Sequence, residues 1–536
     1  MCGGMSEVGA LCVGGVGTRR GRLGKEGRRR RRGVQHVRER GRPWGHPPGV
    51  CCAGSWENER ETGGVRWGSG EEVARATGGV LEVSNGKQGG GSVTTDTRRV
   101  GEGQWFVALK GERFDGNGFL GEARGRGAFG CVGEVSAEEA FGGERGSGAD
   151  CCYVRVEDGL EALQGLARDV RSRFEGPVVG VTGSCGKTTT RAMIALALGP
   201  AYGPVHATEG NLNNHVGVPL TLLQTPADSK AIVLEMGMNH LGEIDVLQEI
   251  GRPTVRVVTN VGPVHLEGCG TIEGVAAAKG EMFDGAVEGD VCVKNADDPL
   301  VKALPVPAGI RVVTFGEAEG ADVRLVEAEV AADGSETTFT LEHGGESVEG
   351  KCPGPGLHLA RNAAAAVCVA VTLGVDFVDA VKALAAYEPV GMRMRTEVSR
   401  GPLGLTVLND CYNANPLSSS CALEMLAGLE SQGRRVAFLG DMLELGPATE
   451  ASHADLVAEL AETYADTMPL AAVCGPAYQA AVERSGAPFP LAYASSEDLA
   501  RAVGTGEVAM ARGDVILVKG SRSIGMEAVV EALLEL

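Results

Sequence analysis

One glycine-rich segment with a single lysine has the residue types of a phosphate-binding loop: Gly183-Ser184-Cys185-Gly186-Lys187-Thr188-Thr189. It follows an apolar run and precedes a helical pattern, so backbone amides and the positive end of a helix would face an anion there. Lys187 would reach the outer phosphates of a nucleotide, and the Thr188 hydroxyl would hold Mg²⁺. The usual spacing G-x-x-x-x-G-K-[ST] fails at one position, where Val181 replaces the first glycine. The segment predicts phosphate binding, with a glycine-rich turn and a solvated lysine as the alternative.

Two further polar residues follow apolar runs that we interpret as buried strands. Glu235 ends the run 232–234, and His265 follows the run 257–259. Ligands of α/β proteins bind at the carboxyl ends of strands, so these side chains could hold a second Mg²⁺. Taken singly, the glutamate could cap a helix and the histidine could be a packing or hydrogen-bonding residue. Beside a phosphate loop, they indicate a metal-dependent site.

Lys279 lies in an otherwise small and apolar helical stretch, Ala276-Ala277-Ala278-Lys279-Gly280-Glu281. Its amine could reach solvent through its flexible stem. If the amine is buried instead, its pKa falls, and the neutral form reacts with electrophiles, including carbon dioxide.

The elements that must position these residues form an α/β pattern with three domains. Strand-like and helical runs alternate over 177–390, which predicts a parallel sheet with helices on both faces. Residues 321–350 alternate apolar and polar around Asp333-Gly334, as in an appended antiparallel hairpin. Residues 71–176 predict a small N-terminal α/β domain, and residues 391–536 predict a Rossmann-like C-terminal one. Residues 1–70 lack apolar periodicity and are expected to be disordered.

Composition excludes several classes of protein. No run of about 18 apolar residues occurs, so no membrane span is predicted. The 15 cysteines are scattered without a C-x-x-C pair, which argues against a disulfide framework or a zinc site. Residues 1–55 hold eleven Arg and one Lys against three Glu, a formal charge of +9. Because the whole chain has a net charge of −20, the remaining residues carry −29. Such an acidic body argues against nucleic-acid binding.

The basic N-terminal segment, with its arginine run at residues 28–32, is similar to an organelle transit peptide, which would place the protein in the chloroplast stroma or another organelle. The segment has few serines and no clear amphipathic helix, so a basic tail on a cytoplasmic protein stays open.

An ordered series of motifs over residues 72–536 resembles the Mur ligases of peptidoglycan synthesis. Besides the phosphate loop, Glu235, His265 and Lys279, the series comprises Thr95-Asp96-Thr97-Arg98, Thr208-Glu209-Gly210-Asn211-Leu212-Asn213-Asn214, Met392-Arg393, Asn409-Asp410-Cys411-Tyr412-Asn413-Ala414-Asn415-Pro416, Asp441-Met442-Leu443-Glu444-Leu445-Gly446 and Lys519-Gly520-Ser521-Arg522. The third-domain runs resemble those of the branch that adds D-alanyl-D-alanine, and the Asp-Asn-Pro-Arg motif of the neighbouring branch is absent. Cys185 departs from the family, which often has Asn in that place.

The resemblance implies an ATP-dependent ligase that joins D-alanyl-D-alanine to UDP-N-acetylmuramoyl-tripeptide through an acyl phosphate, acting as a monomer. It implies ATP and Mg²⁺ at Lys187, Thr188, Glu235 and His265, with a carbamylated Lys279 as a further metal ligand. Nucleotide contacts would come from the loop, Asn362, Arg393 and Asp410. Substrate contacts would come from Asp96, Thr97, Arg98, Thr208, Asn211, Asn213, Asn214, Tyr412 and Asn413. A related ligase with another acceptor, including a folate-type glutamate ligase, and a nucleotide-binding scaffold without turnover are the alternatives.

Overall fold

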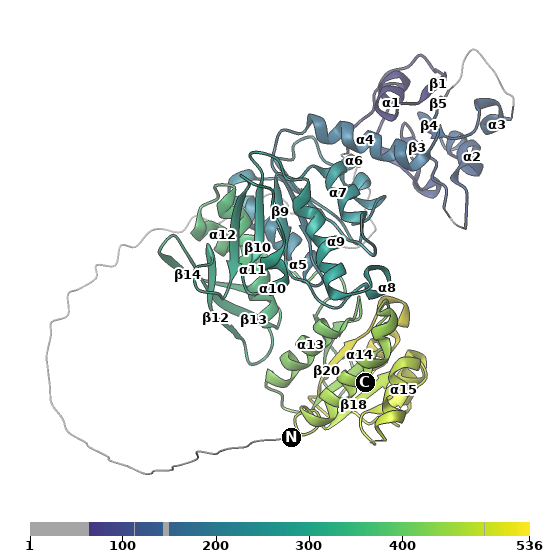
Figure 1. The fold of residues 1–536 in the computed structure, drawn as a ribbon. Coiled ribbons are helices and arrows are strands. Elements are labelled where there is room, and N and C mark those ends of the chain that lie inside the picture. The colour runs from purple at the N-terminus through teal and green to yellow at the C-terminus, as the bar shows by residue number, and fades with distance from the viewer. Residues whose placement is uncertain (1–63, 112, 143–149, 487) are drawn as a thin grey trace, which may run out of the picture. The chain divides into compact units, whose positions relative to one another are not determined.

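The computed structural model describes residues 64–111, 113–142, 150–486 and 488–536 (Figure 1). The arginine run and most of the predicted transit peptide lie outside the described residues. The expectation that disorder extends to residue 70 is wrong for residues 64–70. Trp67 is fully buried, and its carbonyl accepts a hydrogen bond from Nε1 of Trp105 at 3.0 Å. Burial of one large indole outweighs the glycine-rich composition around it.

The first domain is built on a five-stranded sheet with strand order β1-β5-β4-β3-β2, in which only the β1–β5 pair is antiparallel. The strands are β1 Val80–Val83, β2 Val93–Thr94, β3 Trp105–Val107, β4 Gly130–Gly133 and β5 Cys152–Arg155. The α-helices are α1 Gly70–Thr77, α2 Leu120–Gly125, α3 Ala137–Phe141 and α4 Gly159–Arg173.

The central domain is built on a nine-stranded sheet with strand order β14-β13-β12-β11-β10-β9-β6-β8-β7. The strands are β6 Val178–Thr182, β7 Val205–Ala207, β8 Ala231–Glu235, β9 Val255–Val258, β10 Val291–Asn295, β11 Arg311–Gly316, β12 Val323–Val330, β13 Glu336–His343 and β14 Glu346–Pro353. The α-helices are α5 Lys187–Tyr202, α6 Gly217–Leu223, α7 Glu243–Gly251, α8 Leu266–Cys269, α9 Ile272–Asp284, α10 Pro299–Ala303, α11 Leu357–Thr372 and α12 Phe377–Ala383.

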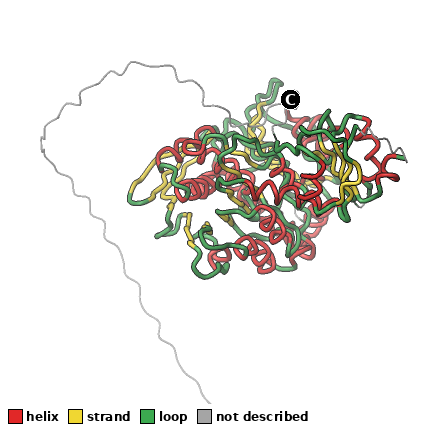
Figure 2. The backbone as a smooth tube through the Cα atoms, turned by 90° about the horizontal axis from the view of Figure 1, so that it is seen from above, coloured by secondary structure: helices red, strands yellow, loops and turns green. Residues whose placement is uncertain are grey.

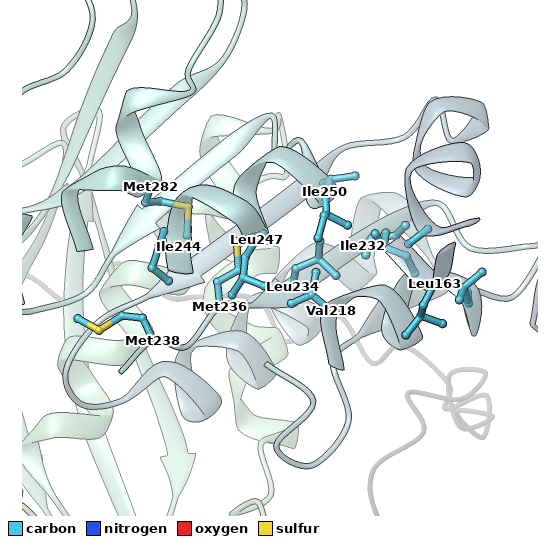
Figure 3. Packing of buried hydrophobic residues seen from close by; sticks show 14 of the residues in the cluster. Leu163, Val218, Ile232, Leu234, Met236, Met238, Ile244, Leu247, Ile250 and Met282 are labelled. Carbon is cyan, nitrogen blue, oxygen red and sulfur yellow. The ribbon is translucent and has the colours of Figure 1, made fainter. Parts of the chain in front are cut away.

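Successive residues of the buried central strands point to opposite faces of the sheet, and each face has its own core. Ile232 and Leu234 of β8 pack on one face with residues of α4, α6, α7 and α9. Figure 3 shows Leu247 and Ile250 of α7 close to Leu234, with Ile244 of the same helix nearer to Met236 and Met282. On the other face, the neighbouring strand residues pack with α5, α11 and α12. This two-sided burial explains the near-continuous apolar runs in the sequence.

The predicted antiparallel hairpin is confirmed, and it is larger than expected. Strand β12 runs parallel to β11 and pairs antiparallel with β13. A third strand, β14, continues the antiparallel pairing to Pro353. The alternating pattern of the sequence therefore extends three residues beyond the predicted end.

The C-terminal domain is built on a six-stranded sheet with strand order β15-β16-β20-β17-β18-β19, parallel except for β15. The strands are β15 Arg395–Val398, β16 Thr406–Asp410, β17 Arg435–Gly440, β18 Leu470–Cys474, β19 Leu491–Tyr493 and β20 Val515–Lys519. The α-helices are α13 Pro416–Gly428, α14 Thr449–Glu462, α15 Pro476–Ser485, α16 Ser496–Thr505 and α17 Glu527–Glu535.

Helices and strands alternate along most of the described chain (Figure 2). The three sheets confirm the predicted α/β fold class. Within the described ranges, no helix has both the length and the apolar character needed to cross a membrane. The cysteines found there are all free thiols, Cys151 and Cys152 included.

Candidate active site

The glycine-rich loop connects β6 to α5, as the sequence predicts. Val181 is a buried residue of β6, so the loop begins at Gly183 and the missing first glycine is not needed. Gly183 has a φ of +154°, and a Cβ there would lie 1.9 Å from Oγ1 of Thr259. Gly186 has a φ of +78°, and a Cβ there would lie 2.7 Å from Oδ1 of Asn362. Both positions therefore require glycine.

Residues that follow β9 hold this loop in place. The Asn260 side chain accepts from the Cys185 amide at 2.8 Å and donates to the Cys185 carbonyl at 3.0 Å. Ser184 donates its amide to the Asn260 carbonyl at 3.0 Å, and its Oγ accepts from the Gly262 amide at 2.8 Å. The loop conformation is thus set by the protein itself, which is the arrangement that favours binding of a charged ligand without reorganisation.

Lys187 is the first residue of α5, and its ammonium bends back to the loop. Nζ donates to the Gly183 carbonyl at 2.7 Å. Burial lowers the pKa of Lys187, and the nearby Glu235 carboxylate opposes that shift. A cation held here at the start of a helix is placed to offset phosphate charge.

Glu235 ends β8 as a nearly fully buried carboxylate, 1% exposed. Oε1 accepts from Nδ2 of Asn213 at 2.9 Å, and the Glu235 amide donates to Oγ1 of Thr208 at 3.0 Å. Oε2 has no hydrogen-bond partner, and Nε of Arg191 lies 3.8 Å from it. A buried carboxylate oxygen without a partner is costly, so this oxygen suits a cationic ligand.

His265 precedes α8, with a φ of +52°. Its Nδ1 lies 2.8 Å from Oε2 of Glu444 of the C-terminal domain. The two atoms lie close together but make no aligned hydrogen bond. Burial lowers the pKa of His265, which favours the neutral imidazole.

Lys279 is buried in α9, 1% exposed, so of the two settings that the sequence left open its amine has the buried one. Burial, and next the charge of Lys187, lower its pKa well below the usual range. In the described part of the chain, no carboxylate lies within ion-pair distance of its amine. A neutral buried amine is the form that reacts with carbon dioxide, so the environment suits carbamylation.

Most of the predicted residues line one cavity of about 1340 Å³. It is bounded by residues of the central and C-terminal domains. The predicted residues among them are Ser184, Cys185, Gly186, Lys187, Thr188, Thr189, Asn211, Asn213, Asn214, Glu235, His265, Asn362, Arg393, Asp410, Tyr412 and Asn413. The cavity can accommodate a nucleotide with a second substrate beside it.

Six predicted residues do not line this cavity: Gly183, Thr208, Lys279, Asp96, Thr97 and Arg98. Gly183 accepts from Lys187 and Thr208 accepts from the Glu235 amide, two residues that do line it, and Lys279 is buried in α9. Asp96 instead accepts from the amide and the guanidinium of Arg98 and caps the short 3-10 helix Thr97–Arg99 of the first domain. The Arg98 side chain lowers the pKa of Asp96. This group forms a separate, local structure.

The C-terminal side of the cavity contains a buried ion pair that the sequence did not reveal. Nζ of Lys519 donates to Oδ2 of Asp410 at 2.6 Å and to the Asn413 carbonyl at 2.9 Å. The guanidinium of Arg393 stacks over the Tyr412 ring, 3.6 Å from its centre. Strands β16 and β20 are neighbours, which brings Asp410 and Lys519 together.

Sequence reasoning assigned no role to four residues that shape the site: Asn260, His358, Glu444 and Lys519. His358 lines the cavity, and burial lowers its pKa. Asn260 follows a predicted strand, so its position at the carboxyl edge of the sheet, beside the loop, could have been inferred from the sequence. The contacts of Glu444 and Lys519 depend on the arrangement of loops and strands that lie far apart in the sequence.

No cluster of three or more His, Cys, Asp or Glu side chains suited to a metal ion occurs in the part of the chain that the structure describes. The predicted set contains only Glu235 and His265 of these types. Mg²⁺ commonly takes one or two protein carboxylates and completes its shell with phosphate oxygens and water. Two candidate protein ligands, Glu235 and His265, beside a phosphate loop fit that pattern.

Comparisons with known proteins agree with this geometry. The Mur ligase middle domain matches residues 181–370, and the Mur ligase glutamate ligase domain matches residues 394–522. A UDP-N-acetylmuramoyl-tripeptide–D-alanyl-D-alanine ligase of Bacillus subtilis is 35% identical over 446 residues, 83% of this chain and 93% of that protein. The ligase of the same name from Escherichia coli is 36% identical over 467 residues, 85% and 97% of the two chains.

Solved structures give the same result. A crystal structure of MurF from Acinetobacter baumannii has a TM-score of 0.78 at 29% identity, covering 88% of this chain and all of that one. MurF of Thermotoga maritima in complex with ADP has a TM-score of 0.70 at 31% identity, covering 83% and 97% of the two chains. The chain therefore belongs to the Mur ligase family.

Proposed function

We propose that this chain is an ATP-dependent ligase that joins D-alanyl-D-alanine to UDP-N-acetylmuramoyl-tripeptide in peptidoglycan precursor synthesis. The observation that carries the proposal is a preset phosphate loop that shares one cavity with a buried carboxylate oxygen lacking a hydrogen-bond partner, with residues of the C-terminal domain completing the cavity. The Bacillus and Escherichia relatives bear this activity in their names, at 35% and 36% identity.

The reaction begins with transfer of the γ-phosphoryl group of ATP to the terminal carboxylate of the tripeptide, which gives an acyl phosphate and ADP. The dipeptide amine, once deprotonated, attacks the acyl carbon, and the tetrahedral intermediate expels phosphate to leave the amide. Lys187 and the loop amides offset negative charge as the anionic carboxylate approaches the γ-phosphate. No covalent protein nucleophile is needed, because the cavity acts by positioning.

Magnesium fits the central side of this cavity. Thr188, Glu235 and His265 would hold it, and the buried Oε2 of Glu235, which lacks a partner, supports this placement. A carbamate on Lys279 would add an acidic ligand. When bound, the metal supplies positive charge that neutralises phosphate oxygens.

Substrate contacts are assigned by domain. Asp96, Thr97 and Arg98 would bind the uridine nucleotide in the first domain. Asn211 and Asn214 would line the acceptor side, together with Tyr412 and Asn413 of the C-terminal domain. Asn362, Arg393 and Asp410 would contact ATP.

A coupled assay tests the function. The full chain is mixed with ATP, Mg²⁺, UDP-N-acetylmuramoyl-tripeptide and D-alanyl-D-alanine, and phosphate and product mass are followed. We expect phosphate release only when the dipeptide is present, with a product heavier by the dipeptide minus water. Phosphate release without the dipeptide, or with glutamate or a dibasic amino acid in its place, would assign a different ligase. Nucleotide binding without phosphate release would identify a scaffold.

We also propose that the arginine-rich N-terminal segment targets the protein to a plastid. Its composition, eleven Arg against three Glu over residues 1–55, supports the proposal. Sequencing the N-terminus of the protein isolated from its natural source tests it. A mature protein that lacks the arginine run is expected, and retention of that run would contradict targeting by cleavage.

We further propose that the enzyme works as a monomer, in which residues of its own central and C-terminal domains meet in the cavity. Sedimentation of the active protein checks this, and activity confined to a dimer would contradict it.

A further inference from the structure

A groove of about 510 Å³ between α4 and α7 adjoins the phosphate cavity. Asn214, Gly237 and Glu243 line both the groove and the cavity. The Gly237 amide donates to the Asn213 carbonyl at 2.8 Å, and Nδ2 of Asn213 donates to Oε1 of Glu235 at 2.9 Å. One end of the groove is therefore close to the candidate metal ligand Glu235.

The two sides of the groove are held together by the protein. Gln164 of α4 is buried, and its Nε2 donates to the His215 carbonyl at 3.2 Å. Farther along α4, Nε of Arg171 donates to the Gly251 carbonyl at the end of α7 at 2.8 Å. These bonds fix α4 against the central domain, so the groove is formed before a ligand binds, as is usual for ligand sites.

Part of the groove is apolar. Leu160 of α4 and Leu247 of α7 line it, together with Leu241 and Val246, which are 55% and 38% exposed. A single exposed apolar residue is ordinary, but these two share a groove that leads to the phosphate cavity. An aliphatic group that covered them would remove apolar surface from water, which is favourable. The groove therefore suits an aliphatic chain.

The charged residues of the groove are acidic. Glu161 of α4 and Glu243 of α7 line it, and no lysine or arginine does so in the part of the chain that the structure describes. Burial opposes ionisation of Glu243, but hydrogen bonds from the Asn239 amide and from His240 lower its pKa overall. The Glu161 side chain is 68% exposed, and its Oε2 lies 3.5 Å from Nη1 of Arg168. A carboxylate can accept about four hydrogen bonds, so both can receive a further donor.

The start of α7, which an anion would otherwise favour, already holds carboxylates. The Gly242 amide donates to Oε1 of Glu281 at 2.7 Å, and the Asp245 amide donates to Oε2 of the same residue at 3.1 Å. The Asn239 amide donates to Oε2 of Glu243 at 2.7 Å. These carboxylates offset the positive end of the helix. An ammonium group therefore fits the groove better than a further carboxylate.

We propose that the groove binds the side chain of the third residue of the tripeptide, and that Glu243 and Glu161 select a side chain that ends in an ammonium group. The reacting carboxylate and this side chain are attached to one α-carbon, so the side chain must lie beside the reaction centre. Its aliphatic stem would cover Leu241 and Val246 while its amine reaches the carboxylates. Lysine and diaminopimelate both have such an amine. The identity of the ligand rests on the proposed function.

Equilibrium binding without turnover tests the subsite. UDP-N-acetylmuramoyl-tripeptides that differ only in the third residue are titrated into the full chain by calorimetry, with Mg²⁺ and a non-hydrolysable ATP analogue and without D-alanyl-D-alanine. Lysine and diaminopimelate peptides are compared with a norleucine peptide, which keeps the four-carbon stem and lacks the amine. We expect the better basic peptide to bind about tenfold more tightly than the norleucine peptide. Equal affinity for all three overturns the proposal.

Substitution of the two glutamates locates the selection. Glu243→Gln combined with Glu161→Gln keeps the side-chain shapes, and the preference for the basic peptide should fall to about twofold or less because the charge attraction is removed. Glu249→Gln, at an exposed glutamate of α7 outside the groove, should keep the full preference. An unchanged preference in the double variant means that the amine binds elsewhere, and this overturns the proposal.

The apolar part of the groove is tested by Leu241→Asn. This change should weaken binding of the basic and norleucine peptides by the same factor, about fivefold, because the stem is common to both. Val287→Asn, at a valine that is 64% exposed and lines neither cavity, is the control. Unchanged affinity in Leu241→Asn overturns the placement of the stem.

These results separate the subsite from the reaction. Peptide binding with the expected preferences, but without product when D-alanyl-D-alanine and ATP are added, would support the subsite and remove the proposed ligase activity. Product formation with equal use of the basic and norleucine peptides would keep the activity and overturn the subsite. If none of the peptides binds, both proposals fail.

Discussion

The two sides of the cavity treat their buried charges differently. On the central side, Oε2 of Glu235 lacks a hydrogen-bond partner and has only a loose ion pair with Nε of Arg191 at 3.8 Å, and Lys279 has no ion pair within the described residues. On the C-terminal side, Lys519 is buried to a similar degree but binds Asp410 at 2.6 Å. Unpaired buried charges destabilise a protein, whereas a satisfied pair is costly only to break. The central side is thus prepared for ligands, and the C-terminal pair stabilises its own domain.

Removing the loop cation should have the largest effect. Lys187→Ala should lower kcat/KM by about 10³-fold, because no other group replaces its charge beside the γ-phosphate. Initial rates of phosphate release over a range of ATP concentrations measure the loss. Lys382→Ala, at an exposed lysine of α12, is the control and should behave as the unmodified enzyme.

Lys279 tests the claim that buried polar groups on the central side of the cavity lack close partners in the free protein. Lys279→Met should lower turnover by about 10²-fold or more through loss of the carbamate, yet raise the midpoint of urea unfolding in buffer free of carbon dioxide. The stability should rise because the apolar methionine side chain replaces a buried amine that has no ion-pair partner. Lys279→Ala should regain part of its activity with short carboxylates. Lower stability together with full activity would show that this lysine is structural.

Replacing Lys519 should lower the stability of the protein, whereas replacing Lys279 should raise it. Lys519→Met removes the buried cation that pairs with the partly buried Asp410 and should cost about 3 kcal/mol of unfolding free energy. Adding Asp410→Asn should restore much of it, because the pair then disappears together. Urea unfolding of the three variants gives the comparison, and a stabilised Lys519→Met would remove the contrast between the two sides.

The conformation of the phosphate loop can be destabilised by a substitution that removes no charged group. Asn260→Ala removes two hydrogen bonds to Cys185, each worth about 1 kcal/mol, so KM for ATP should rise roughly 10- to 30-fold. KM for the dipeptide should stay constant and serves as the internal control. Equal changes in both constants would mean that the substitution disturbs the whole domain.

A smaller effect comes from His358 at the cavity wall. Burial lowers its pKa below the ordinary 6.5, so the unfolded chain takes up the proton first as the pH falls. Stability should therefore decrease below about pH 6.5, by at most about 1.4 kcal/mol per pH unit. His358→Gln should flatten this slope, which denaturant unfolding between pH 5 and pH 7 measures. An unchanged slope would assign the pH dependence to other groups.

The central side of the cavity was largely predictable from the sequence. Glu235 and His265 follow apolar strands, and the carboxyl ends of parallel strands share one edge, so their approach to the loop follows from the alternating pattern. The small apolar neighbours of Lys279 indicated that it could be buried, and the structure decides between burial and a solvent-reaching amine. Each signal is local, within a few residues of the side chain concerned.

The C-terminal side was less predictable, because its contacts depend on strand order. Asp410 and Lys519 lie 109 residues apart and meet only because β16 and β20 are adjacent. Glu444 and His265 both have left-handed backbone conformations. The intrinsic preferences of Glu and His do not predict such conformations, so the sequence did not indicate that the two residues meet. The substrate roles of Asp96, Thr97 and Arg98 stay predictions, since these residues lie in the first domain and do not line the cavity.

The acyl-phosphate route is the central claim, and an isotope measurement tests it most directly. The terminal carboxylate of UDP-N-acetylmuramoyl-tripeptide is labelled with ¹⁸O and converted with ATP and D-alanyl-D-alanine, and the released phosphate is examined by mass spectrometry. Transfer of the γ-phosphoryl group to that carboxylate predicts one ¹⁸O atom from the substrate in each phosphate. Phosphate free of the label would contradict the account, because its fourth oxygen would then have come from water.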